Sequence, residues 1–172
     1  IAFGRGPGGF TGVRLCASVV QGLAWGAGRP VVPVSSLQAV AQAALDRDPQ
    51  AAGVLVCNDA RMREVYWARF ARGPDGLARP EGPERVDPPE AVALPRDPGS
   101  ARGPVVGAGR GFAIHPQLDP ARLGLARTWP ELWPSAADVA RLAVPAVAAG
   151  RVPPAAEAPP GHAPDRGAKP AP

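Results

Sequence analysis

A glycine-dense run near the start of the chain restricts the possible fold more than any other stretch. The run Gly4-Arg5-Gly6-Pro7-Gly8-Gly9-Phe10-Thr11-Gly12-Val13-Arg14 follows a short apolar stretch and precedes a long apolar-periodic one, which stops before Gly28 and Pro30. This pattern predicts a strand, a tight turn and a helix over about 10–27. Such a turn brings backbone close to a phosphate or to a neighbouring element of an α/β domain.

Two nucleotide-binding motifs fit the glycine run only in part. Its Gly-x-Gly-x-x-Gly spacing is that of the dinucleotide fingerprint, which also needs a carboxylate at the end of the next strand. That strand, predicted over 31–34, ends in Ser35-Ser36 instead. A Walker-type phosphate loop needs Lys and then Ser or Thr after its last glycine, where this chain has Val13-Arg14. We therefore favour a structural turn with positive φ at a glycine and a φ fixed by Pro7.

The predicted helix has an unusually wide apolar surface. Its apolar residues form two adjacent stripes that cover about 220° of the circumference, whereas packing on one sheet needs an arc of about 100°. One stripe contains Phe10, Val13, Ala17, Val20 and Ala24, and the other contains Gly12, Leu15, Cys16, Val19 and Leu23. We expect such a helix to be covered on two sides, by its own sheet and by either a neighbouring helix or a second protein. A fully internal helix fits the pattern equally well.

Two motifs, in this order, resemble one protein family. The first is the glycine run, with Gln21-Gly22-Leu23-Ala24 and Pro33-Val34-Ser35-Ser36-Leu37 after it, and the second is Asp59-Ala60-Arg61-Met62-Arg63-Glu64-Val65-Tyr66-Trp67-Ala68. They are similar to the bacterial tRNA threonylcarbamoyladenosine biosynthesis proteins of the TsaB family, also called YeaZ, over about 1–150. The motif residues are Gly4, Arg5, Gly6, Pro7, Gly8, Gly9, Thr11, Gly12, Arg14, Asp59, Arg61, Glu64 and Tyr66.

The resemblance implies an α/β fold of the two-lobed actin/Hsp70-like (ASKHA) type, with mixed sheets and flanking helices. It implies a non-catalytic partner of the related catalytic subunit TsaD and the ATPase TsaE, which together make N6-threonylcarbamoyladenosine at position 37 of tRNA. The chain would meet tRNA only through this complex and bind no cofactor itself, while the complex uses ATP. In the family the helix after the glycine run lies in the lobe that pairs with TsaD or forms homodimers. The expected interface residues are Phe10, Val13, Leu15, Cys16, Val19 and Leu23.

The resemblance also suggests how the chain divides. Family members carry a segment before Ile1, so we expect an N-terminally truncated sequence in which 1–52 is the remainder of the first lobe. Residues 53–150 are expected to form the second lobe, with a loop-rich insertion at 73–103. A Pro/Ala-rich disordered tail is expected at 151–172. A helix predicted over 136–149 should kink or end early at Pro145.

Three charged residues crowd the turn that is predicted after a buried strand at 53–59. Asp59 and Glu64 suggest a catalytic carboxylate pair, but we favour a turn capped by Asp59, in which Arg61 neutralises both carboxylates. Cys16 and Cys57 are expected to be buried thiols in a reducing compartment rather than a disulfide framework.

Two rival functions remain. An independent nucleotide-binding ATPase of the same superfamily is the first alternative, and a glycoprotease-like metallopeptidase is a distant second. His115 and His162 lie far apart, without a second histidine at metal-ligand spacing, which disfavours the metallopeptidase and leaves no expected metal site.

The charge of +4 and pI near 10 are compatible with nucleic-acid binding. The basic residues are nevertheless scattered arginines, apart from Lys169, and no interleaving of aromatic and basic residues is visible. This favours an ordinary solvated surface. No apolar run reaches the length of a membrane span, so a cytoplasmic protein is expected.

Overall fold

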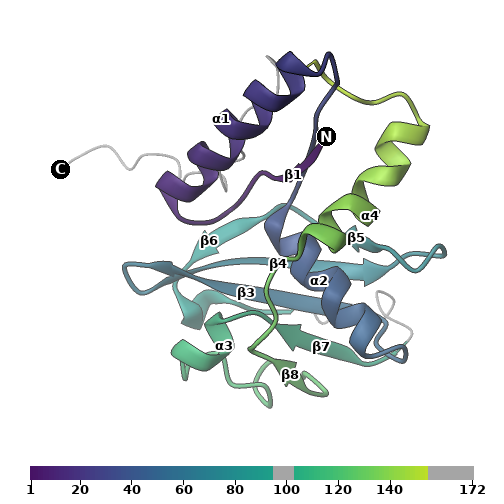
Figure 1. Ribbon diagram of the computed structural model, residues 1–172. Coiled ribbons are helices and arrows are strands. Elements are labelled where there is room, and N and C mark those ends of the chain that lie inside the picture. Colours follow the sequence, from purple (N-terminus) through teal and green to yellow (C-terminus); the bar gives the residue numbers. More distant parts are fainter. Residues whose placement is uncertain (95–102, 155–172) are drawn as a thin grey trace.

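The computed structural model describes residues 1–94 and 103–154, and these ranges form two lobes, each built on its own sheet (Figure 1). In the smaller lobe, β1 (Ala2–Gly4) and β2 (Val32–Val34) pair in parallel, with Ala2 opposite Val32. Helix α1 (Phe10–Gly26) covers one face of this pair and α4 (Ala136–Ala148) covers the other. Phe3 faces α1, while Ala2 and Val34 face α4, because successive strand residues alternate between faces.

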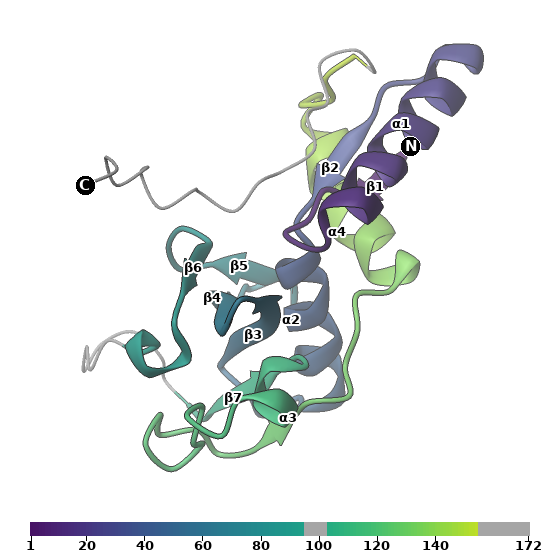
Figure 2. The ribbon, with the colours of Figure 1, turned by 90° about the vertical axis from the view of Figure 1, so that its left-hand side faces the viewer.

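The larger lobe contains a mixed sheet in the order β5-β4-β3-β7-β8, and β6 pairs with β4. Strands β3 and β4 are antiparallel, whereas β7 runs parallel to β3 and β8 parallel to β7. The helix α2 covers one face of this sheet, and α3 lies against β3 (Figure 2). The bounds are α2 (Ser36–Arg47), β3 (Gly53–Arg61), β4 (Glu64–Arg72), β5 (Ala78–Pro80), β6 (Arg85–Asp87), β7 (Val105–Ala108), α3 (Gly111–Ile114) and β8 (Thr128–Trp129), with a 3-10 turn at Pro89–Ala91.

The central strands β3 and β4 are apolar on both faces. Ala68 and Phe70 join the core beneath α2, and Tyr66 packs against that core. Val65 and Trp67 join Leu55 and Cys57 in a second core on the opposite face, as the alternation in the sequence predicts. Both faces of the sheet are therefore covered, and its buried strands hold the turn between β3 and β4 in a fixed position.

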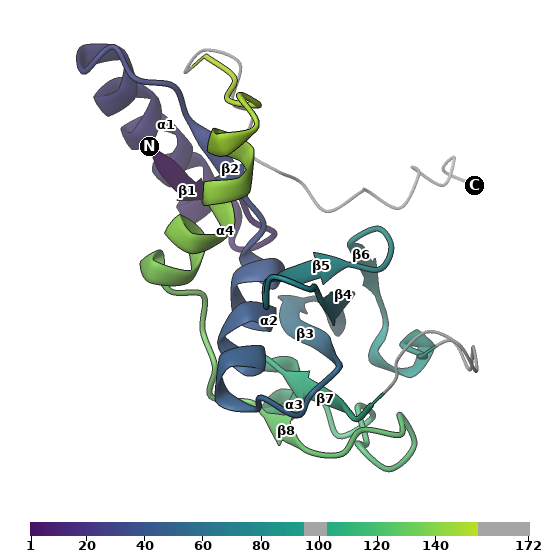
Figure 3. The same ribbon diagram turned by 90° about the vertical axis from the view of Figure 1, so that its right-hand side faces the viewer.

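Two helices pack on different lobes from those expected from chain order. Helix α2 lies in the expected first-lobe range 1–52, yet it packs on β3, β4, β5 and β7 of the large sheet (Figure 3). Helix α4 lies in the expected second-lobe range 53–150, yet it packs on β1 and β2. Each helix packs where its apolar residues find cover. Helix α2 is buried on several sides, and Val139 and Ala143 of α4 pack against Val34.

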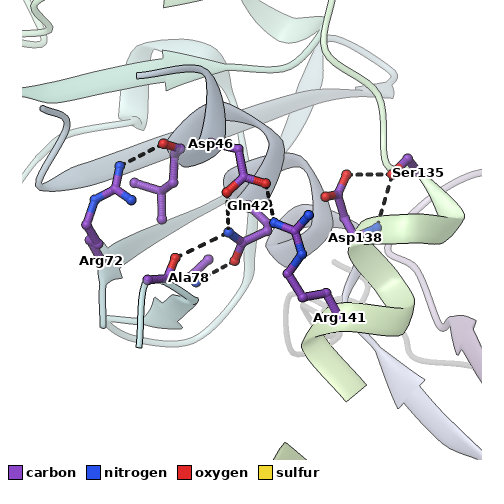
Figure 4. Close-up of polar contacts among 9 residues, drawn as sticks. Gln42, Asp46, Arg72, Ala78, Ser135, Asp138 and Arg141 are labelled. Atoms are coloured by element: carbon purple, nitrogen blue, oxygen red, sulfur yellow. Dashed lines mark hydrogen bonds and ion pairs between the residues drawn. The ribbon is translucent and has the colours of Figure 1, made fainter. Parts of the chain in front are cut away.

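Polar side chains join these helices to their surroundings (Figure 4). The buried Gln42 donates to Asp46 Oδ1 at 3.0 Å and accepts from Ala78 N at 2.9 Å. Asp46 also accepts a hydrogen bond from Arg141 of α4. Because Gln42 and Asp46 both belong to α2, this helix connects β5 of the large sheet to α4 of the small lobe.

Two local expectations differ from the structure. Part of the expected loop at 73–103 forms β5, β6 and the 3-10 turn. Both strands pair with β4, and β5 is also held by Gln38, which donates to the Ala78 carbonyl, and Gln42, which accepts from the Ala78 N–H. Helix α4 continues through Pro145 to Ala148, so the expected early end at this proline is wrong, and the helix stops before Gly150, whose φ is 66°. Residues 95–102 of the expected insertion and 155–172 of the expected tail, including His162, lie outside the described residues. In the described ranges, no helix combines the length and the hydrophobicity that crossing a bilayer requires.

Candidate partner interface

Helix α1 turns one of its two apolar stripes inward. Ala17 and Ala24 are buried in a small core with Phe3 and Val31, and Val20 packs against its edge. Alanines at these positions let the helix axis lie close to β1, because they add little volume between helix and strand. The stripe beside it faces solvent: Leu15 is 63% exposed, Val19 51% and Leu23 60%.

We call Leu15, Val19 and Leu23 the outer face of α1. Phe10 is also exposed, but it starts the helix on the side of the inner stripe. Among the six predicted interface residues, Val13 and Cys16 are only half-buried, at the border between the inner and outer faces. Cys16 is thus not the buried thiol that the sequence suggested. Trp25 is 79% exposed but is not among the predicted interface residues, because its position on the helix lies between polar side chains. Three large apolar side chains, each more than half exposed on one stripe of the helix, form an unusually apolar surface.

The glycine run forms a turn that contacts both lobes. Gly6 has a φ of 96°, the Gly6–Pro7 peptide is cis, and the Gly6 carbonyl accepts from Ser36 N at 2.8 Å. Arg5 forms an ion pair with Glu84 of the large lobe at 3.1 Å. The remaining glycines of the run, with Thr11, lie at the N-terminal end of α1 beside Arg14, whose guanidinium stacks over the Phe10 ring at 3.3 Å.

A cavity of about 460 Å³ separates this turn from the hairpin between β3 and β4. Gly8, Gly9, Phe10, Thr11 and Gly12 line one side, and Asp59, Ala60, Arg61, Met62 and Tyr66 line the other. The two sequence motifs, almost fifty residues apart in the chain, thus face each other across one cavity.

Asp59 has a side-chain hydrogen-bond partner that the sequence did not indicate. Its Oδ1 lies 3.0 Å from Nε2 of His115, which follows α3, and also accepts from Arg61 N at 3.3 Å. The backbone contact is the expected turn cap. The expected neutralisation of Asp59 by the Arg61 guanidinium is wrong among the described residues, where the side chain that contacts this carboxylate is His115.

Neither a reactive thiol nor a metal site is found among the described residues of this region. Burial raises the pKa of the Cys57 thiol well above its ordinary value, against a smaller lowering effect of Arg122, so this thiol stays protonated and unreactive. The described residues contain no group of three or more His, Cys, Asp or Glu side chains arranged to hold a metal ion.

Comparison with known proteins identifies the class of protein. Residues 1–117 match the sequence profile of the family described as TsaD: tRNA N6-adenosine threonylcarbamoyltransferase. The chain is 39% identical over 151 residues to the tRNA threonylcarbamoyladenosine biosynthesis protein TsaB of Escherichia coli, which covers 88% of this chain and 64% of that protein. It is 56% identical over 72 residues to the TsaB of Haemophilus influenzae, covering 42% of this chain and 30% of that protein.

Solved structures give the same answer. YeaZ from Pseudomonas aeruginosa superposes with a TM-score of 0.82 and 41% sequence identity, covering 94% of this chain and 73% of that chain. A second structure from this organism, described as having similarity to peptidase YEAZ, gives a TM-score of 0.84 at 41% identity and covers 95% of this chain and 73% of that chain. The chain belongs to the TsaB (YeaZ) family, and its fold is the mixed α/β, ASKHA-like fold of that family. It spans 64% or less of the length of the first curated relatives that it matches.

Proposed function

We propose that this chain works in the synthesis of N6-threonylcarbamoyladenosine on tRNA, as a non-catalytic subunit that docks on a TsaD-like catalytic subunit through the outer face of α1. The names of its relatives supply the pathway. The observation that carries the docking role is the exposure of Leu15, Val19 and Leu23 on a helix whose opposite face is already buried.

The composition of the outer face suits a partner helix. Gly22 and Gly26 lie on α1 with open space where a side chain would be, although glycine inside an exposed helix costs about 1 kcal/mol relative to alanine. Gaps of this kind let a second backbone approach closely, while Val19, Leu23 and Trp25 supply the apolar contact area that such an interface buries.

The chemistry beside the cavity supports a non-catalytic role. The His115 imidazole is held by Asp59, and the only thiol near this pair in the described residues, Cys57, is buried and protonated. The described residues offer no activated nucleophile there. A TsaE-like ATPase and tRNA would then interact with the assembled complex, which is where ATP is used.

The experiment is a binding titration by surface plasmon resonance between this chain and the TsaD-like subunit of the same organism. Val19→Arg and Leu23→Arg each place a charge on the outer face and should weaken binding by about 100-fold or more. Val144→Arg is the matched control, because Val144 is an equally exposed valine, 61%, on α4.

Circular dichroism melts must show that the three variants unfold at the temperature of the parent protein. Unchanged binding by both α1 variants would contradict the proposal. Loss of binding by Val144→Arg alone would move the interface to α4.

A further inference from the structure

The hairpin between β3 and β4 projects an apolar side chain between two arginines. Met62 is 93% exposed, and Arg61 and Arg63 beside it are exposed as well. We call these three residues the hairpin tip. In Figure 1 this turn lies near the purple, N-terminal end of α1. No ion pair among the described residues involves Arg61 or Arg63. Their charges are therefore available for contact with a partner.

The backbone of the tip is unfavourable for the residues that occupy it. Arg61, Met62 and Arg63 have φ values of 64°, 48° and 60°, all in the left-handed region. Turns with this backbone favour asparagine and glycine, because other side chains clash with the backbone there. Strained positions of this kind concentrate at sites that contact ligands or partners, so the tip side chains themselves suggest a function.

The tip stands between two hollows. Met62 lines the cavity of about 460 Å³ shared with Phe10, the first residue of α1. It also lines a cavity of about 540 Å³ on the other side, with Ile114 and Pro89. Phe10 and Ile114 are themselves exposed. Phe10, Met62 and Ile114 therefore form an exposed apolar strip along the two hollows, which begins at the N-terminal end of α1.

The charges around this strip favour a protein over a nucleic acid. Charges of both signs line the hollows: Arg61 lies beside Asp59 in the first, and Arg63 lies with Glu64 and Glu90 in the second. A continuous phosphate backbone following the hollows would meet these carboxylates. A protein surface can instead present its own carboxylates to the arginines and an apolar pocket to Met62.

We propose that the hairpin tip is a second contact for the same TsaD-like subunit, received by an apolar pocket that is rimmed with acidic residues. The inference rests on the proposed function, since the tip shares a cavity with the N-terminal end of the same helix, α1. Met62 fills the pocket, and Arg61 and Arg63 pair with the acidic rim and speed association.

The test measures association and dissociation rates of the full chain with the TsaD-like subunit at low and high salt. Arg61→Glu/Arg63→Glu should lower the association rate constant about tenfold or more at low salt and flatten its salt dependence. Met62→Ala should raise the dissociation rate. Arg79→Glu/Arg151→Glu, which makes the same change in net charge at exposed arginines elsewhere, should leave the rate constants close to those of the parent.

The outcomes separate this inference from the proposed function. Normal kinetics for both tip variants, together with lost binding by Val19→Arg, would overturn the second contact and leave docking through α1 intact. If the control pair lowered the association rate constant equally, net charge alone would explain the effect, and the second contact would also be overturned. Tip variants that lose affinity for tRNA but not for the TsaD-like subunit would assign the tip to RNA and overturn the protein contact.

Discussion

The Nε2 atom of His115 lies 3.0 Å from the carboxylate of Asp59, although 56 residues separate them in the chain. The approach depends on close packing of α3 against β3: a side-chain Cβ at Gly111 would lie 2.7 Å from the carbonyl oxygen of Cys57. The glycine lets α3 lie on the strand, and the residue that follows α3 then reaches the end of β3. The pair fixes one side of the hairpin that carries the tip.

We expect His115→Ala to lower the free energy of unfolding by about 1 kcal/mol, because the pair is only partly shielded from water. Urea unfolding of His115→Ala, Asp59→Asn and the double variant measures the coupling between the two side chains. The double variant should lose less than the sum of the two single losses. Strict additivity would mean that the contact contributes nothing to stability.

The hairpin tip should be stabilised by residues that tolerate its backbone. Met62→Asn/Arg63→Gly is expected to raise the free energy of unfolding by about 1–2 kcal/mol, since both positions have positive φ. Met62→Ala keeps the backbone cost and should change stability by less than about 0.5 kcal/mol. Chemical denaturation compares the three proteins. A destabilised Asn-Gly variant would show that the tip side chains support the fold.

We expect substitution of Gln42 to lower the free energy of unfolding more than substitution of most other polar residues. Gln42→Leu should cost about 2–3 kcal/mol, because it leaves the buried Ala78 N–H without its acceptor and removes a donor from the Gly76 carbonyl. Gln38→Leu is the matched control: it removes one bond to Ala78 O from a half-buried side chain and should cost about 1 kcal/mol. Hydrogen exchange at Ala78, with urea unfolding, tests both, and equal costs would contradict the argument.

Stability should decrease at alkaline pH because of Cys57. The folded state keeps this thiol protonated well above its ordinary pKa of 9.0, whereas the unfolded chain releases the proton near that value. The unfolded state therefore binds fewer protons above pH 9, and folding loses up to about 1.4 kcal/mol per pH unit from this group.

The Cys57 contribution is isolated by comparing urea unfolding of the parent and Cys57→Ala between pH 8 and 10.5. The parent should lose stability more steeply with rising pH than the variant, whose absolute stability is lower throughout because of the cavity. Parallel pH dependences would contradict a buried, protonated thiol.

Local order was determined largely by the sequence. The helix predicted over about 10–27 is observed at Phe10–Gly26, and Ser35 caps α2 by accepting from Leu37 N and Gln38 N. Val65 and Trp67 pack on one face of the large sheet and Tyr66 and Phe70 on the other, which follows from the period of two residues in a strand. Periodicity, caps and turn glycines act within a few residues, so they can be recognised without knowing what packs against them.

Tertiary structure alone decided which surfaces meet. The two stripes of α1 are similarly apolar, and the stripe with Ala17 and Ala24 faces inward because small side chains fit close to Phe3, leaving Leu15 and Val19 outside. The exchange of α2 and α4 between lobes and the pairing of His115 with Asp59 depend likewise on contacts between segments far apart in the chain. Such contacts are set by complementary shape and burial in three dimensions, which the order of residues along the chain does not reveal.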